Sequence, residues 1–125
     1  MTSPEPTVLD ARAADRMVRL GGLDLLDQRM ALREEGGPQR IAAAEAAAAA
    51  GALPAVQRAA HSLKSSAGNL GLSALQQQAH EVESAAGAGE RAAVLAGVAR
   101  LEPLFASGLN ALRSLRSSMR EDDGD

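Results

Sequence analysis

Residues 60–71 read Ala-His-Ser-Leu-Lys-Ser-Ser-Ala-Gly-Asn-Leu-Gly, and they belong to a segment whose apolar residues recur with the period of an α-helix. A helix turns by about 100° per residue, so apolar and polar side chains in this segment fall on opposite faces. His61 is therefore predicted to lie in solvent, with a lysine one turn away. The predicted apolar face holds Val56, Ala59, Ala60, Leu63, Ala67 and Leu70. The predicted polar strip holds Gln57, Arg58, His61, Lys64, Ser65 and Gly68.

This motif resembles that of the histidine-containing phosphotransfer (HPt) domains of bacterial His-Asp phosphorelays. Members carry a phosphorylatable histidine, a hydrophobic residue, lysine at plus three, a small residue at plus four, glycine at plus seven and often Leu-Gly at plus nine and ten. Glycine is usual at plus four, so Ser65 is a departure from the pattern. The resemblance extends more loosely from about Leu9 to Met119. The matching residues are His61, Leu63, Lys64, Ser65, Gly68, Leu70 and Gly71.

The resemblance implies that His61 is the phosphoacceptor. It also implies a Gln or Glu on the next helix that accepts a hydrogen bond from the second ring nitrogen, and counting through the motif places Glu83 there. The residues themselves supply a chemical reason for the site. Neutral imidazole is nucleophilic near pH 7, and Lys64 and Arg58 are cations that can screen the roughly −2 charge of a phosphoryl group. An ordinary solvated lysine and an ordinary surface acid remain the alternative interpretations of Lys64 and Glu83.

The rest of the polar strip is predicted to form the docking surface for a partner. Its residues, Gln57, Ser65 and Gly68, are small or uncharged and leave room for a partner's loops. The other histidine, His80, has no comparable motif and is interpreted as part of a polar flank. A metal site is not predicted, because two histidines on separate helices without a fixed short spacing are weak evidence for one.

Composition limits the class of protein. The 125 residues fit one domain, and with one Phe and no Trp or Tyr they favour closely packed helices over a β-sandwich. The net charge of −3 argues against nucleic acid as a main partner. No cysteine is present, so a disulfide framework and a thiolate metal site are excluded.

The sequence shows neither a signal-peptide pattern nor a run near the roughly 18 apolar residues of a membrane span. The prediction is therefore a cytoplasmic domain that does not interact with a membrane.

Glycine pairs and prolines divide the N-terminal half into three predicted helices. Thr7 can cap the first helix, and Gly21-Gly22 ends it. The second runs from about residue 23 to residue 35 and is predicted to stop at Gly36-Gly37. Pro38 suits the first turn of the third, which continues through the alanine-rich tract.

The C-terminal half predicts three more helices. The motif helix ends at Gly71, and a capping box at Ser73 opens the next helix. The last helix has hydrophobic residues at spacings of four and three from Val94 to Met119. Pro103 interrupts this pattern, so the helix is either kinked there or restarted with Pro103 near its first turn. Because the hydrophobic register continues through the proline, a kink is predicted.

Short connections make successive helices antiparallel. The predicted fold is therefore all-α: an up-down-up-down four-helix bundle with one or two additional N-terminal helices. The chain divides into a flexible leader at 1–7, a single helical domain at 8–119 and a disordered acidic tail at 120–125.

Together, these observations predict a phosphocarrier that accepts a phosphoryl group on His61 from a receiver-domain aspartate and passes it to another receiver. No Gly-rich phosphate loop or nucleotide-binding pattern is present, so an enzyme with its own ATP site is not expected. The implied partners are response-regulator receiver domains and a hybrid histidine kinase. No cofactor is expected in this chain, and Mg²⁺ would belong to the receiver. Two alternatives stay open: a non-transferring module that binds a receiver or kinase as an antagonist, and the phosphoacceptor module of a larger chemotaxis-type kinase.

Overall fold

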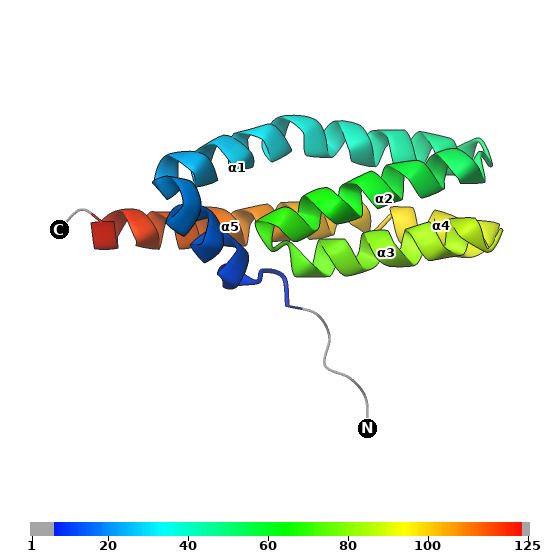
Figure 1. Cartoon of the computed structure of the whole chain (residues 1–125). Coiled ribbons are helices and arrows are strands. Elements are labelled where there is room, and N and C mark those ends of the chain that lie inside the picture. Colours follow the sequence, from blue (N-terminus) through cyan, green and yellow to red (C-terminus); the bar gives the residue numbers. More distant parts are fainter. Residues whose placement is uncertain (1–6, 124–125) are drawn as a thin grey trace, which may run out of the picture.

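The computed structural model describes residues 7–123, with side chains up to Met119, and every regular element in this range is a helix. Successive arms of the bundle run antiparallel in an up-down-up-down arrangement, which confirms the predicted fold class (Figure 1). Helices α4 and α5 follow one another to form the fourth arm of the bundle. The helices are α1 (Ala11–Ala49), α2 (Leu53–Leu70), α3 (Ser73–Gly87), α4 (Arg91–Val98) and α5 (Leu101–Asp123).

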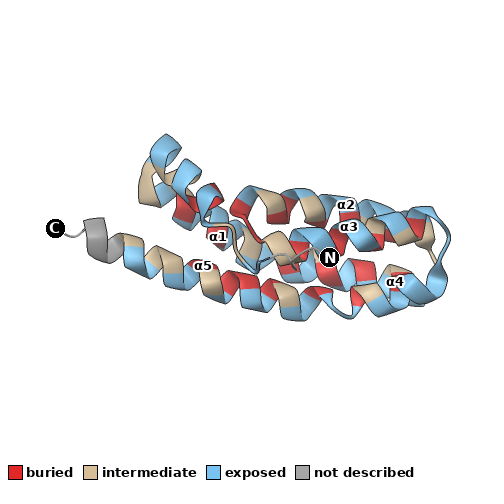
Figure 2. Cartoon of the chain, turned by 90° about the horizontal axis from the view of Figure 1, so that it is seen from below, coloured by how far each residue is buried: buried red, intermediate tan, exposed pale blue. Residues whose placement is uncertain are grey.

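The bundle core is built from leucine, valine and alanine on the inner faces of all five helices (Figure 2). The predicted apolar face of α2 is buried, except that Ala59 is half-buried. Much of the core is alanine, and such small side chains allow helix axes to approach closely. The largest fully buried side chains are Leu26, Ile41, Val56, Leu70, Leu72, Leu75, Val82, Val94, Leu101 and Leu112.

The N-terminal part of α1 crosses the end of the bundle near the turn between α2 and α3 (Figure 1). The backbone leaves helical geometry at Gly22, where φ is 75° and ψ is −175°, so the predicted break at the first glycine pair is present as a kink. The predicted cap at Thr7 is wrong. Asp10 caps the helix instead, because its side chain accepts a hydrogen bond from the Arg12 N–H. The Asp10 N–H also donates to the carbonyl of Gly71 at 2.7 Å, which ties this segment to the α2–α3 turn.

The predicted helix end at Gly36-Gly37 is also wrong, because α1 continues through both glycines and through Pro38. The reason for a glycine at position 37 lies in α5. A Cβ atom there would come within 2.6 Å of the Phe105 ring, so the missing side chain lets the ring lie directly against the α1 backbone. The local sequence around Gly37 predicts a helix end, but this glycine instead allows α1 to pack closely against α5.

The kink predicted at Pro103 is wrong as well. The chain leaves α4 after Val98 and starts α5 at Leu101, which places Pro103 in the first turn of a new helix. Proline is tolerated there because the N–H groups of a first turn have no partner within the helix. The hydrophobic register still continues across the break, since Val94, Leu101 and Phe105 are all buried.

By length and composition alone, the stretch Arg91–Met119 is apolar enough to cross a membrane. The sequence predicts no membrane span here, because the apolar residues of this stretch are spaced rather than consecutive. In the structure this stretch comprises α4 and most of α5, and its larger apolar side chains, except the exposed Leu95, lie in or against the bundle core. Helices that pack in the core of a bundle can be equally long and apolar, so this stretch is weak evidence for a membrane span.

The predicted boundaries at both ends lie largely outside the described residues. Residues 1–6 and 124–125 are not described, nor are the side chains from 120 onwards. The backbone of α5 is helical to Asp123. The leader at 1–7, the domain at 8–119 and the acidic tail at 120–125 stay predictions.

Candidate functional site

The site lies on the seam between α2 and α3, two antiparallel helices joined by a short turn (Figure 1). Gly71 makes this turn possible, because its φ of 75° is in the left-handed region and a side chain there would collide with the Asp10 carbonyl. Facing positions follow one register along the seam. His61 faces Glu83, and two turns further along α2 Gly68 faces Gln76.

His61, Lys64 and Glu83 meet at the middle of this seam. The Nδ1 atom of His61 lies 2.6 Å from Glu83 Oε2, and Lys64 Nζ donates to Glu83 Oε1 at 2.6 Å. The Glu83 side chain is 17% exposed, whereas that of His61 is 63% exposed. One largely covered carboxylate thus binds both residues, while the imidazole remains open to solvent.

This contact determines which ring nitrogen can react. An ionised carboxylate is only an acceptor, so we assign the proton of the neutral imidazole to Nδ1, which donates to Glu83. The Nε2 lone pair is then not engaged by Glu83, on a side chain that is 63% exposed. His61 therefore offers a nucleophilic ring nitrogen, in one fixed tautomer, on an exposed side chain.

The hydrogen bond from Lys64 is the largest influence that lowers the pKa of Glu83. The hydrogen bond from His61 lowers this pKa further, and partial burial opposes both effects. Glu83 is therefore ionised at neutral pH and acts as the acceptor that the tautomer assignment requires.

Replacing Glu83 by Gln is expected to lower the free energy of unfolding at pH 7 by about 1 kcal/mol, because it removes charge-assisted hydrogen bonds. The folded-state pKa of Glu83 lies below its usual value of 4.5, so the stabilisation is complete above that pH and is lost as the pH falls through the folded pKa. Urea unfolding, followed by circular dichroism at neutral and acidic pH, measures the free energy of unfolding of both proteins. A difference between wild type and Glu83→Gln that persists unchanged in acid would contradict the ionic contribution.

Three other predicted residues lie around this cluster without joining its hydrogen bonds. Arg58 and Ser65 are exposed on α2, on either side of His61. The Gln57 amide lies over Gly87, where a Cβ atom would come within 3.0 Å of Gln57 Nε2. Their predicted roles in screening and docking stay predictions.

Gly68 is half-buried, which the polar-strip assignment did not anticipate. A Cβ atom at this position would come within 2.5 Å of Gln76 Nε2, so the glycine makes room for a side chain of α3. The structure thus gives a packing reason for this glycine, beside its predicted place in the docking surface.

His80 lies nearer to the site than its sequence context suggested. Its Nδ1 atom is 3.9 Å from Glu83 Oε1, and the side chain is exposed. The only available signal was its position three residues before Glu83 on the same helix. Within the described part of the chain, no three His, Cys, Asp or Glu side chains are grouped in a way that could hold a metal ion.

Comparison with known protein families identifies the family of this chain. The family model of the Hpt domain matches residues 30–115, which include all of α2 and α3. The chain belongs to the Hpt domain family. Hpt domains are phosphotransfer modules of His-Asp phosphorelays, and family members interact with receiver domains and histidine kinases.

A solved structure agrees with the family assignment. The chain is similar to the crystal structure of histidine-containing phosphotransfer protein B (HptB) from Pseudomonas aeruginosa PAO1, with a TM-score of 0.73 and 27% sequence identity. The similarity covers 94% of this chain and 98% of that chain. Among curated proteins, none matches this chain. The Hpt domain is thus the helical bundle of Figure 1, and its α2–α3 seam carries the candidate site.

Proposed function

We propose that His61 is the phosphoacceptor of this Hpt domain, taking a phosphoryl group from the aspartate of one receiver domain and passing it to the aspartate of another. The observation that supports this most is the 2.6 Å contact between His61 Nδ1 and Glu83, because it leaves the exposed Nε2 atom as the nucleophile. Hpt domains are phosphocarriers without an ATP site of their own. In this proposal, a hybrid histidine kinase is the original source of the phosphoryl group.

In the forward step, the Nε2 lone pair attacks the phosphorus of the donor's aspartyl phosphate. The new P–N bond forms while the P–O bond to the aspartate breaks, and the aspartate leaves as a carboxylate. The imidazole keeps its proton on Nδ1, and Glu83 stabilises the positive charge that develops on the ring. In the return step, the second aspartate attacks phosphorus and Nε2 leaves with its electron pair. Neither step requires this chain to supply or remove a proton, and Mg²⁺ belongs to the receiver in both.

In this proposal Lys64 also screens the negative charge of the phosphoryl group on His61. It can do so while bound to Glu83, because an ammonium group can donate three hydrogen bonds and the bond to Glu83 uses one. We expect Lys64→Ala to slow phosphotransfer about tenfold, equivalent to a loss of about 1–2 kcal/mol of transition-state stabilisation. Rapid-quench measurement of label transfer from a phosphorylated receiver gives the rate. Arg91→Ala is the matched control, since it removes a cation at the start of α4, beside Gly51 and outside the seam between α2 and α3. Wild-type transfer by Lys64→Ala would show that this lysine binds Glu83 without contributing to phosphotransfer.

The test of the proposed function is to incubate the purified chain with a panel of ³²P-labelled receiver domains. Label is expected to move to the chain in a bond that is labile in acid and stable in alkali, as phosphoramidates are. ATP and Mg²⁺ alone are expected to leave the chain unlabelled. Binding of receivers without label transfer from any of them would favour the antagonist alternative, and labelling by ATP alone would contradict the carrier function.

We also propose a cytoplasmic location, where receivers and the catalytic parts of histidine kinases work. Two features support it: the apolar stretch of α4 and α5 is used in the bundle core, and the site is formed by polar side chains on an open seam. Cell fractionation with an antibody against the chain tests this location.

A further inference from the structure

Two acids of helix α1 form ion pairs with α5. Asp27 pairs with Arg116 at 2.6 Å, and Glu34 pairs with Arg113 at 2.9 Å. These ion pairs join α1 to α5 on the side of the bundle away from the seam that carries His61.

Three arginines of α1 follow a different line, which we call the arginine stripe: Arg29, Arg33 and Arg40. Spacings of four and seven residues place them above one another on one side of the helix. That side faces α2, because Arg40 Nη1 donates to Ser66 Oγ at 3.0 Å. In the sequence this contact was invisible, since its two residues are 26 positions apart.

The arginine stripe carries positive charge that the described residues do not neutralise. Among residues 7–119, no carboxylate forms an ion pair with any of its three members. Arg33 Nε is buried and has no hydrogen-bond partner within that same part of the chain. Burial lowers the pKa of Arg33, and the neighbouring charges of Arg40 and Arg29 lower it further. In a chain with a net charge of −3, such a concentration of one sign on one surface requires a reason.

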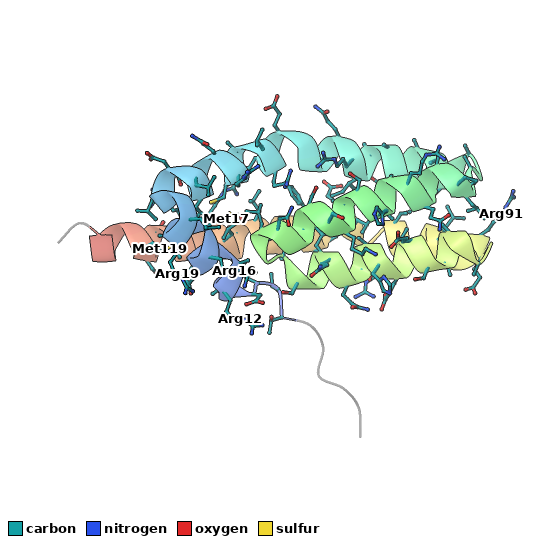
Figure 3. The ribbon with its side chains drawn as sticks, viewed as in Figure 1. Arg12, Arg16, Met17, Arg19, Arg91 and Met119 are labelled. Carbon is teal, nitrogen blue, oxygen red and sulfur yellow. The ribbon has the colours of Figure 1, made fainter. Side chains whose placement is uncertain are left out.

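The other group of arginines on α1 differs in this respect. Arg12, Arg16 and Arg19 lie on the segment before the Gly22 kink (Figure 3). There Arg12 binds the Asp10 carboxylate at 3.0 Å, and Arg19 donates to a backbone carbonyl. Local partners thus occupy two of these three guanidinium groups.

The arginine stripe borders the helix that carries the proposed site. Helices α1 and α2 lie side by side, and Ser66 of α2 joins the stripe to the helix that carries His61 (Figure 1). Ser62 and Ser65, on the exposed surface of α2, add no charge between the two regions. Leu32, which is 52% exposed, adds an apolar contact on the same stretch of α1.

We propose that the arginine stripe binds an acidic surface of the receiver partner while His61 engages the receiver's aspartate. This inference rests on the proposed function and adds the chemistry of the partner's second contact: carboxylate side chains positioned to meet α1. Guanidinium groups suit this task because they bind carboxylates with two parallel hydrogen bonds and stay charged at every working pH. Nucleic acid fits less well, because its phosphates demand a more extended basic surface than three residues on an acidic chain.

The test compares Arg29→Glu with Arg91→Glu, two reversals of charge at exposed positions. Arg91 lies at the far end of the bundle (Figure 3), at the start of α4. Affinity for each member of the receiver panel is measured by fluorescence anisotropy at about 50 and about 300 mM salt, a range over which electrostatic contacts weaken strongly. Arg29→Glu is expected to raise Kd about tenfold at low salt and to reduce the salt dependence, whereas Arg91→Glu changes Kd less than about twofold. The double variant Arg33→Gln, Arg40→Gln is expected to behave like Arg29→Glu.

Thermal melts of all variants show whether a weaker affinity reflects a loss of folding. If the double variant is unstable because Arg33 and Arg40 are half-buried, the exposed Arg29→Glu variant still tests the inference. Label transfer is measured separately on the same receivers. Wild-type labelling with equal Kd values for Arg29→Glu and Arg91→Glu would overturn the inference and leave the proposed function standing. Binding that Arg29→Glu weakens, without label transfer, would support the inference and reject the carrier function. Absence of binding to every receiver, or selective loss of duplex DNA binding in Arg29→Glu, would overturn the inference.

Discussion

Replacing His61 by Gln is expected to reduce phosphotransfer to the detection limit, a loss of at least about a thousandfold, because an amide nitrogen has no lone pair available to attack phosphorus. The fold is expected to be unchanged, since the His61 side chain is 63% exposed and its one described partner is Glu83. Label from a phosphorylated receiver measures the first result, and the circular dichroism spectrum with the melting temperature measures the second.

The matched control is His80→Gln, which removes the chain's other histidine. Its Nδ1 atom lies 3.9 Å from the same carboxylate, so both variants alter one neighbourhood and only one of them removes the proposed nucleophile. His80→Gln is expected to keep transfer within about twofold of wild type, because a histidine at this distance makes no strong hydrogen bond to Glu83. Labelling of His61→Gln that disappears in the double variant would instead assign the phosphoacceptor to His80.

The sequence predicts those parts of this site whose residues lie close together along the chain. His61 and Lys64 are three residues apart, so helical periodicity alone places them together on one exposed strip. Glu83 lies on another helix, and periodicity gives no register between two helices. Only the resemblance to HPt domains indicated its position. The contact between Arg40 and Ser66 had neither kind of signal and appeared only in the structure.

The errors in the fold have a common physical origin. Gly36-Gly37 and Pro38 are local signals for a helix boundary, yet Gly37 is required by the Phe105 ring of a helix more than sixty residues away. At Pro103 the register fitted both a kink and a restart, and the chain takes the restart after Val98, which costs no hydrogen bond inside a helix. Tertiary packing and backbone hydrogen bonding decided these positions, whereas the buried and exposed faces followed the sequence pattern closely.

The faces of α2 therefore provide the sharpest test of the fold. Val56 is fully buried in the bundle core, whereas its neighbour Gln57 is exposed on the seam with α3. Val56→Asp is expected to lower the free energy of unfolding by about 4 kcal/mol or more, because it removes a buried apolar side chain and places an unpaired carboxylate in its position. That loss is comparable with the whole stability of many domains, about 5–15 kcal/mol, so a largely unfolded chain is expected at 37 °C.

Gln57→Asp introduces the same side chain one residue later, where a turn of about 100° brings it to the exposed side. Its expected cost is below about 1 kcal/mol, the range for surface substitutions. Urea titration of both variants, followed by far-ultraviolet circular dichroism, compares the two positions directly. Similar midpoints would mean that α2 does not divide into a buried and an exposed face. The separation of His61 from the core, on which the proposed chemistry depends, would then be wrong as well.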